Sequence, residues 1–158
     1  MHRNLAAIVL AVAVFASPLA RAQDAVSGVT DLAALRTAVQ ADKKAFVAAT
    51  LQLSDAEAKK FWPIYADYQR DLDAANRQRT RALEGVIALD KPMSELYARS
   101  LGKDLLAADE AELRARRTAQ TRVLKVLPAP KAVRYMQLES KIRAVQAYDV
   151  AAAFPLAK

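Results

Sequence analysis

The stretch LSDAEAKKFWPIYADYQRDL, residues 53–72, contains both the start signal and the apolar face of a long helix. Ser54 and Glu57 have the spacing of a capping box, in which the serine hydroxyl and the glutamate carboxylate each accept a hydrogen bond from the other residue's amide. At 100° per residue, the apolar side chains that follow share one helical face: Phe61, Ile64, Tyr65, Tyr68 and Leu72. The stretch therefore predicts an amphipathic helix from residue 55, and Pro63 in its third turn predicts a kink.

The helical spacing of apolar residues continues before residue 53 and after residue 72, and it predicts an all-α fold of four helices. Alanine is abundant, glycine is rare and no segment alternates apolar and polar residues, so no strand is expected. The two central helices are each roughly 50 Å long and are expected to form an antiparallel hairpin on which the shorter outer helices pack. The expected segments are a flexible start at 23–29, one helical domain at 30–153 with helices at 31–49, 55–89, 93–127 and 130–153, and a tail at 154–158.

Residues 1–22 have the three-part pattern of a secretory signal peptide. Arg3 supplies the positive start, an apolar run covers residues 5–15, and Ala22 ends a small-x-small cleavage site before Gln23. The apolar run is too short to span a bilayer, which takes about 20 residues. We therefore expect cleavage between Ala22 and Gln23, no membrane span afterwards, and a periplasmic location, with secretion as the less favoured alternative.

Composition excludes most enzyme classes from the expected mature chain. Cleavage removes the sole histidine, His2, and the chain has no cysteine, so no Ser-His-Asp triad, cysteine nucleophile or imidazole–thiolate zinc site is available. Three glycines leave no glycine-rich phosphate loop. We expect no catalytic residue, no cofactor and no metal site, and a protein that is not an enzyme.

The positive charge suggests an acidic partner. Cleavage removes Arg3 and Arg21 from the 24 basic residues and none of the 17 acidic ones, so the net charge falls from +7 to +5. Nucleic acid is scarce outside the cytoplasm and is not expected as a partner. Acidic segments of proteins, anionic lipid headgroups and lipopolysaccharide are better candidates in that compartment.

Arg79 is a charged residue in the middle of the apolar face of the helix expected at 55–89, and a charge there needs a partner. If the hairpin folds about Lys91, Asp104 faces Arg79 from the other helix. We expect an ion pair between them that sets the register of the hairpin. Binding of an anionic ligand by Arg79 is the less favoured alternative.

The helix expected at 93–127 has a second apolar line, opposite the first. It consists of Leu106, Leu113 and Leu124, with Arg99 and Arg117 flanking it. A helix with two apolar faces packs against a different partner on each face. Burial against another helix or subunit is favoured because large exposed patches are uncommon in monomers. Contact with a client protein is the alternative, and Trp62, about 100° from the main face of its own helix, is a further candidate for it.

These features resemble the Spy/CpxP-like, LTxxQ-motif family of exported proteins. The resemblance rests on the signal peptide, the long central hairpin and the box Leu53-Ser54-Asp55-Ala56-Glu57, in which Glu57 replaces glutamine. The family's second box would fall at residues 127–131, where Pro128 replaces threonine and Lys131 replaces glutamine. Residues 61–65 and 133–139 resemble a divergent branch of the group. The resemblance implies an ATP-independent periplasmic chaperone or envelope-stress protein, a curved antiparallel dimer that meets unfolded clients through apolar and basic residues.

Two functions of different classes follow from these patterns. A holdase would bind unfolded exported proteins on an open helical surface and release them without nucleotide. A regulatory adaptor would dock one envelope partner, such as the sensor domain of a two-component kinase. The two differ in selectivity, because a holdase protects unrelated clients and an adaptor binds one partner with a defined stoichiometry. A homodimer is compatible with either, since the hairpin extends past its covering helices.

Overall fold

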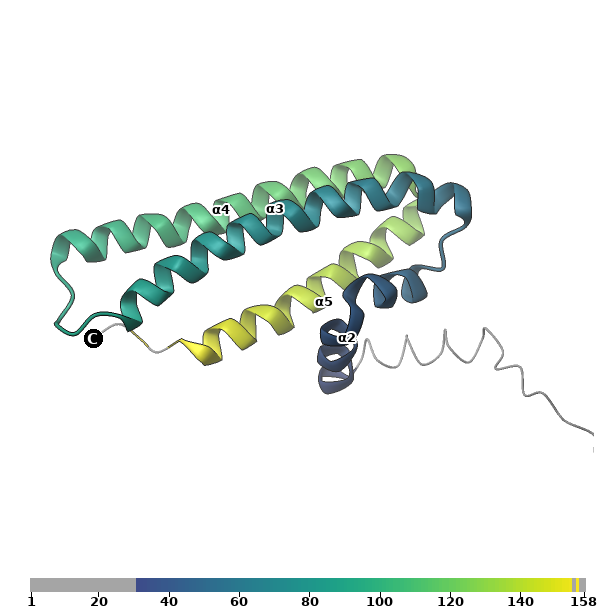
Figure 1. The fold of residues 1–158 in the computed structure, drawn as a ribbon. Coiled ribbons are helices and arrows are strands. Elements are labelled where there is room, and N and C mark those ends of the chain that lie inside the picture. The colour runs from purple at the N-terminus through teal and green to yellow at the C-terminus, as the bar shows by residue number, and fades with distance from the viewer. Residues whose placement is uncertain (1–30, 155, 157–158) are drawn as a thin grey trace, which may run out of the picture.

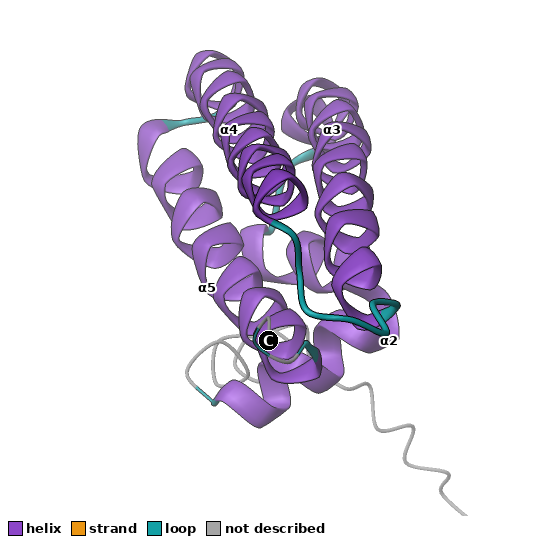
Figure 2. Cartoon of the chain, turned by 90° about the vertical axis from the view of Figure 1, so that its left-hand side faces the viewer, coloured by secondary structure: helices purple, strands orange, loops and turns teal. Residues whose placement is uncertain are grey.

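Two long helices, α3 (Asp55–Ile87) and α4 (Glu95–Val126), lie side by side as an antiparallel hairpin (Figure 1). This computed structural model describes residues 31–154 and 156. In it, α5 (Ala129–Ala153) runs back beneath the hairpin, and α2 (Leu32–Leu51) packs on α5 (Figure 2). The described part has no strand, so the all-α hairpin fold is confirmed. The predicted signal peptide, its Ala22–Gln23 cleavage site and the segment 23–29 lie outside the described residues.

The start of α3 has the predicted capping box. The Glu57 amide donates to Ser54 Oγ at 3.4 Å, and the Ser54 amide donates to Glu57 Oε2 at 2.7 Å. Lys131, in the first turn of α5, also donates to Glu57 Oε2 at 2.7 Å. The hydrogen bonds from Lys131 and the Ser54 amide lower the pKa of Glu57. The capping box therefore also joins the starts of two helices that are far apart in the chain.

Among the described helices, α2 contains a residue with non-helical backbone angles, Asp42, whereas α3 continues through Pro63. Pro63 lies on an exposed side of α3, which stays helical from Asp55 to Ile87. Asp42 has φ −162° and ψ 95°, and its carboxylate accepts from the Ala45 amide at 2.9 Å. Asp42 therefore caps a second helical segment inside α2. Leu32, in the first turn of α2, is 59% exposed, whereas Leu35 is 2% exposed.

The hydrophobic core is concentrated at the end of the hairpin where all four helices meet. Its largest buried side chains are Tyr135, Phe61, Leu51, Leu138, Ile142, Val47 and Val123. A smaller cluster, Tyr68, Leu72, Ala115 and Ala119, continues it between α3 and α4. In residues 76–87 and 95–107, which we call the free end, no side chain is fully buried. The predicted apolar faces are thus buried at one end of the hairpin and only half-buried at the other.

Candidate functional site

The second apolar line of α4 is open to solvent. Leu106, Leu113 and Leu124 are 60%, 38% and 51% exposed, respectively. The alanines of α4 that pack into the protein, Ala115 and Ala119, lie on the opposite side of the helix, against α3. Burial of the line by another described helix of this chain, one form of the favoured expectation, is therefore wrong, and burial against a second subunit stays a prediction. We call the three leucines with Arg99 and Arg117 the α4 stripe.

The two arginines of the α4 stripe are exposed and keep their charges available. Arg99 contacts Glu95 one turn earlier at 3.2 Å, with its side chain 76% exposed. Arg117 is exposed and forms no ion pair with any residue that the structure describes. From Arg99 to Leu124 the α4 stripe extends roughly 37 Å at 1.5 Å per residue. It is long enough to contact an extended peptide of about ten residues.

Trp62 is not beside the α4 stripe. Its ring packs edge-on against Phe61 and Tyr65, with centroids 5.0 and 5.4 Å away. Lys44 of α2 places its ammonium group 5.1 Å from the centroid of the Trp62 ring, a cation–π contact. The side chain is half-buried. Trp62 therefore joins α3 to α2 and does not extend the leucine line of α4.

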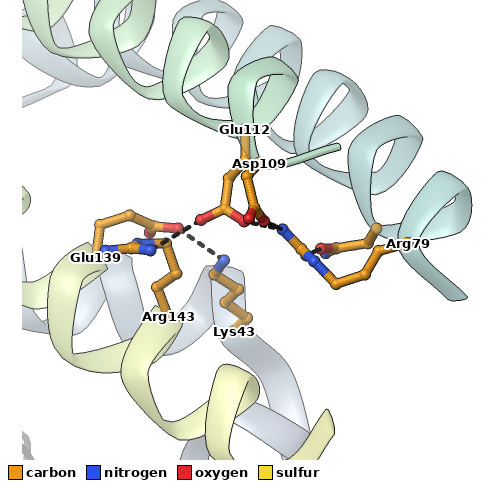
Figure 3. Close-up of polar contacts among 7 residues, drawn as sticks. Lys43, Arg79, Asp109, Glu112, Glu139 and Arg143 are labelled. Carbon is orange, nitrogen blue, oxygen red and sulfur yellow. Dashed lines mark hydrogen bonds and ion pairs between the residues drawn. The ribbon is translucent and has the colours of Figure 1, made fainter. Parts of the chain in front are cut away.

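Arg79 has two acidic partners on α4, and neither is the predicted one (Figure 3). Its Nη2 donates to Asp109 Oδ1 and to Glu112 Oε2, both at 2.8 Å. Burial acts to lower the pKa of Arg79, but these hydrogen bonds outweigh it and raise the pKa. An ion pair inside the hairpin is thus present, with different partners.

The predicted Arg79–Asp104 pair is wrong because the register of the hairpin was read from backbone positions alone. Helical side chains lean toward the N-terminus of their own helix. In an antiparallel pair, that lean carries the Arg79 guanidinium toward later residues of α4. Asp104 instead has its backbone carbonyl near Gln78, whose Nε2 donates to it at 3.5 Å.

A second part of the polar network was not expected from the sequence. Glu112 Oε1 accepts from Arg143 of α5 at 2.9 Å, so one carboxylate joins two arginines. Next to it, Lys43 of α2 donates to Glu139 of α5 at 2.9 Å (Figure 3). Lys43 also donates to Gln69 of α3 at 2.9 Å. Glu139 is 5% exposed. Glu139 lies one turn from Tyr135 on the apolar face of α5. A charged residue on an apolar face is the sequence signal that singled out Arg79, and it could have identified Glu139 as well.

Several polar atoms around this network are buried without a partner among the described residues. They are Tyr68 OH, Gln69 Nε2, Tyr135 OH, Glu139 Oε2 and Arg143 Nε. Burial, and secondly the negative charge of Glu139, raises the pKa of Tyr65, Tyr68 and Tyr135. These phenols therefore stay neutral hydrogen-bonding groups at ordinary pH.

A cavity of about 210 Å³ opens beside the network, between α4 and α5. Its lining contains two arginines, one carboxylate and three uncharged side chains: Arg116, Arg143, Glu139, Gln120, Ser140 and Met136. Arg116 is half-buried, and its guanidinium makes no hydrogen bond or ion pair with any described residue. The cavity therefore places an unpaired cation near buried polar atoms that lack partners.

Comparison with known proteins found no matching family model, no matching curated protein and no matching solved structure. In the described helices, no segment combines the length and the apolar character that crossing a bilayer requires. Within the described residues, His, Asp and Glu form no cluster of three or more that could hold a metal ion. The geometry thus defines an all-α protein with one open apolar and basic helix face.

Proposed function

We propose that this protein is an ATP-independent holdase of the periplasm, a divergent Spy/CpxP-like chaperone that binds unfolded exported proteins on the α4 stripe. The observation that carries the proposal is the exposure of Leu106, Leu113 and Leu124 along one line of α4. Exposed leucines in a row favour contact with another chain, because covering them removes apolar surface from water.

The size of the surface suits reversible binding. A fully buried leucine contributes about 1.5–3 kcal/mol, and the three leucines of the α4 stripe are already partly covered by their own helix. Association also costs translational and side-chain freedom. Binding is therefore weak enough for release without nucleotide. The flanking Arg99 and Arg117 speed encounters with acidic segments through long-range attraction.

The test is aggregation of two unrelated unfolding proteins, followed by light scattering without ATP. The chain from residue 23 is added near stoichiometry, as wild type and as the variant Leu106→Ser/Leu113→Ser/Leu124→Ser. A matched control changes three exposed apolar residues off the α4 stripe: Leu32→Ser, Ile87→Ser and Leu96→Ser, at positions 59%, 56% and 80% exposed. We expect wild type and control to suppress both aggregations and the stripe variant to lose suppression with unchanged helicity.

Other outcomes contradict the proposal in separable ways. Equal loss in both triple variants would mean that general apolar exposure, and not the α4 stripe, binds clients. No suppression by the wild-type chain would overturn the holdase function. Crosslinking that then captures one periplasmic protein at fixed stoichiometry would favour the adaptor.

A further inference from the structure

We infer that the cavity between α4 and α5 is a carboxylate site, which seats an acidic side chain of the peptide bound on the α4 stripe. This inference rests on the proposed function and names the chemical class of client segment that the surface prefers. The juxtaposition that carries it is an unpaired, half-buried Arg116 lining the same cavity as Arg143 and Glu139.

The charge in the cavity favours an anion. Glu139 is the only acidic residue of the lining, and Lys43 already neutralises it at 2.9 Å. Arg143 shares Glu112 with Arg79, so that its charge is partly balanced. The charge of Arg116 has no counterpart in the described part of the chain. A carboxylate in the cavity would give the Arg116 guanidinium two parallel hydrogen bonds.

The lining and the size of the cavity favour a single acidic side chain. Arg116 and Arg143 bring donors to the cavity, and Gln120 and Ser140 add uncharged polar groups. The carboxylate of an aspartate or glutamate accepts from such donors. The cavity volume of about 210 Å³ is below the range of about 300 Å³ and above that is typical for drug-sized ligands. It suits a single side chain.

The cavity lies next to the α4 stripe along the helix. Leu113 and Arg116 are three residues apart, and Gln120 and Leu124 are four apart, so each pair lies on neighbouring turns of one side. A segment that covers Leu113 and Leu124 therefore passes the mouth of the cavity. Clients with an acidic residue among apolar ones would gain the carboxylate contact, and clients without one would bind through the leucines alone.

The experiment measures binding of two labelled peptides by fluorescence anisotropy. Both are extended apolar segments of the same sequence, and they differ only in one central residue, glutamate or glutamine. We expect wild type to bind the glutamate peptide about tenfold tighter, which corresponds to about 1.4 kcal/mol. Arg116→Gln should abolish this preference and leave the glutamine peptide unaffected. Arg116→Lys should restore only part of it, because lysine keeps the charge but lacks the planar fork.

Lys125→Gln is the control for general electrostatics, since it removes one exposed charge from the last turn of α4. It should lower the glutamate preference much less than Arg116→Gln. Equal losses in the two variants would mean long-range attraction and overturn the carboxylate site. Equal binding of both peptides by wild type would overturn it as well while leaving the holdase proposal intact. Binding of neither peptide would overturn the proposed function itself.

Discussion

Lys43 and Glu139, which are 96 residues apart, meet in an ion pair of 2.9 Å at the centre of the protein. Their side chains are only 16% and 6% exposed. The pair fixes the second segment of α2 to the middle of α5, and the hydrogen bond from Lys43 to Gln69 adds α3 to the junction. Three of the four helices are thus positioned by one ammonium group.

Removing one partner of this pair should strongly destabilise the protein. Lys43→Ala leaves the Glu139 carboxylate buried without its cation, and we expect a loss of about 3 kcal/mol or more in urea unfolding. The double variant Lys43→Met/Glu139→Leu should recover most of that loss, because no buried charge remains. Arg99→Ala, which breaks the exposed pair with Glu95, should cost less than about 0.5 kcal/mol. A loss of similar size in Arg99→Ala would contradict this account.

Glu112 should be the acidic residue that holds the hairpin register. Its two oxygens accept from Arg79 and Arg143, and its side chain is 13% exposed. Glu112→Gln should lower the free energy of unfolding by about 1–3 kcal/mol. Asp104→Asn, at the exposed position that the sequence pattern favoured, should have almost no effect. Chemical denaturation of the two variants side by side distinguishes the observed acidic partners of Arg79 from the expected one.

The buried tyrosines should make the fold sensitive to high pH. Burial and the charge of Glu139 raise the pKa of Tyr65, Tyr68 and Tyr135 above the ordinary value of 10.0. A phenol whose pKa is raised by folding stabilises the folded state fully below about pH 10. That contribution is lost as the pH rises further, because the unfolded chain releases the proton first. In a titration followed by tyrosinate absorbance and circular dichroism, three of the five tyrosines should ionise only as helicity is lost. Ionisation of all five with helicity intact would contradict this.

Asp42 should stabilise α2 as an internal helix cap. Its carboxylate accepts from the Ala45 amide at 2.9 Å while its own backbone is extended. Asp42→Ala should cost about 1 kcal/mol, and Asp42→Asn should cost little, since asparagine caps almost as well. Thermal unfolding of both variants measures the difference. Equal stability of Asp42→Ala and wild type would mean that packing alone sets the break.

The helices and most of the core could be predicted because they depend on local rules. The capping box at Ser54 and Glu57 and the period of Phe61, Tyr65 and Leu72 are properties of one segment, and burial at the end where the helices meet preserves them. At the free end the same pattern overestimated burial, because none of the described outer helices buries the side chains of those turns. Position on an apolar face identifies where a side chain points, and not whether anything lies opposite.

The polar contacts could not be predicted because they depend on how separate helices meet. The partners of Arg79 follow from the lean of side chains and the geometry of residues 88–94, which no periodicity determines. The Lys43–Glu139 pair requires the relative placement of α2 and α5. The cavity beside Arg116 likewise depends on how α4 and α5 lie against each other, which no spacing within one helix predicts.

Because the core is concentrated at one end of the hairpin, the two halves of the α4 stripe differ in local stability. Leu113 and Leu124 belong to turns of α4 that contain Ala115, Ala119 and Val123, all buried. Leu106 and Arg99 belong to the free end, where no side chain is fully buried and local opening costs little. Backbone amides at 95–107 should therefore exchange with solvent much faster than those at 113–124. In the proposed holdase, the half at Leu113 and Leu124 would stay rigid, and the half at Arg99 and Leu106 would adjust to bound chains of different shape.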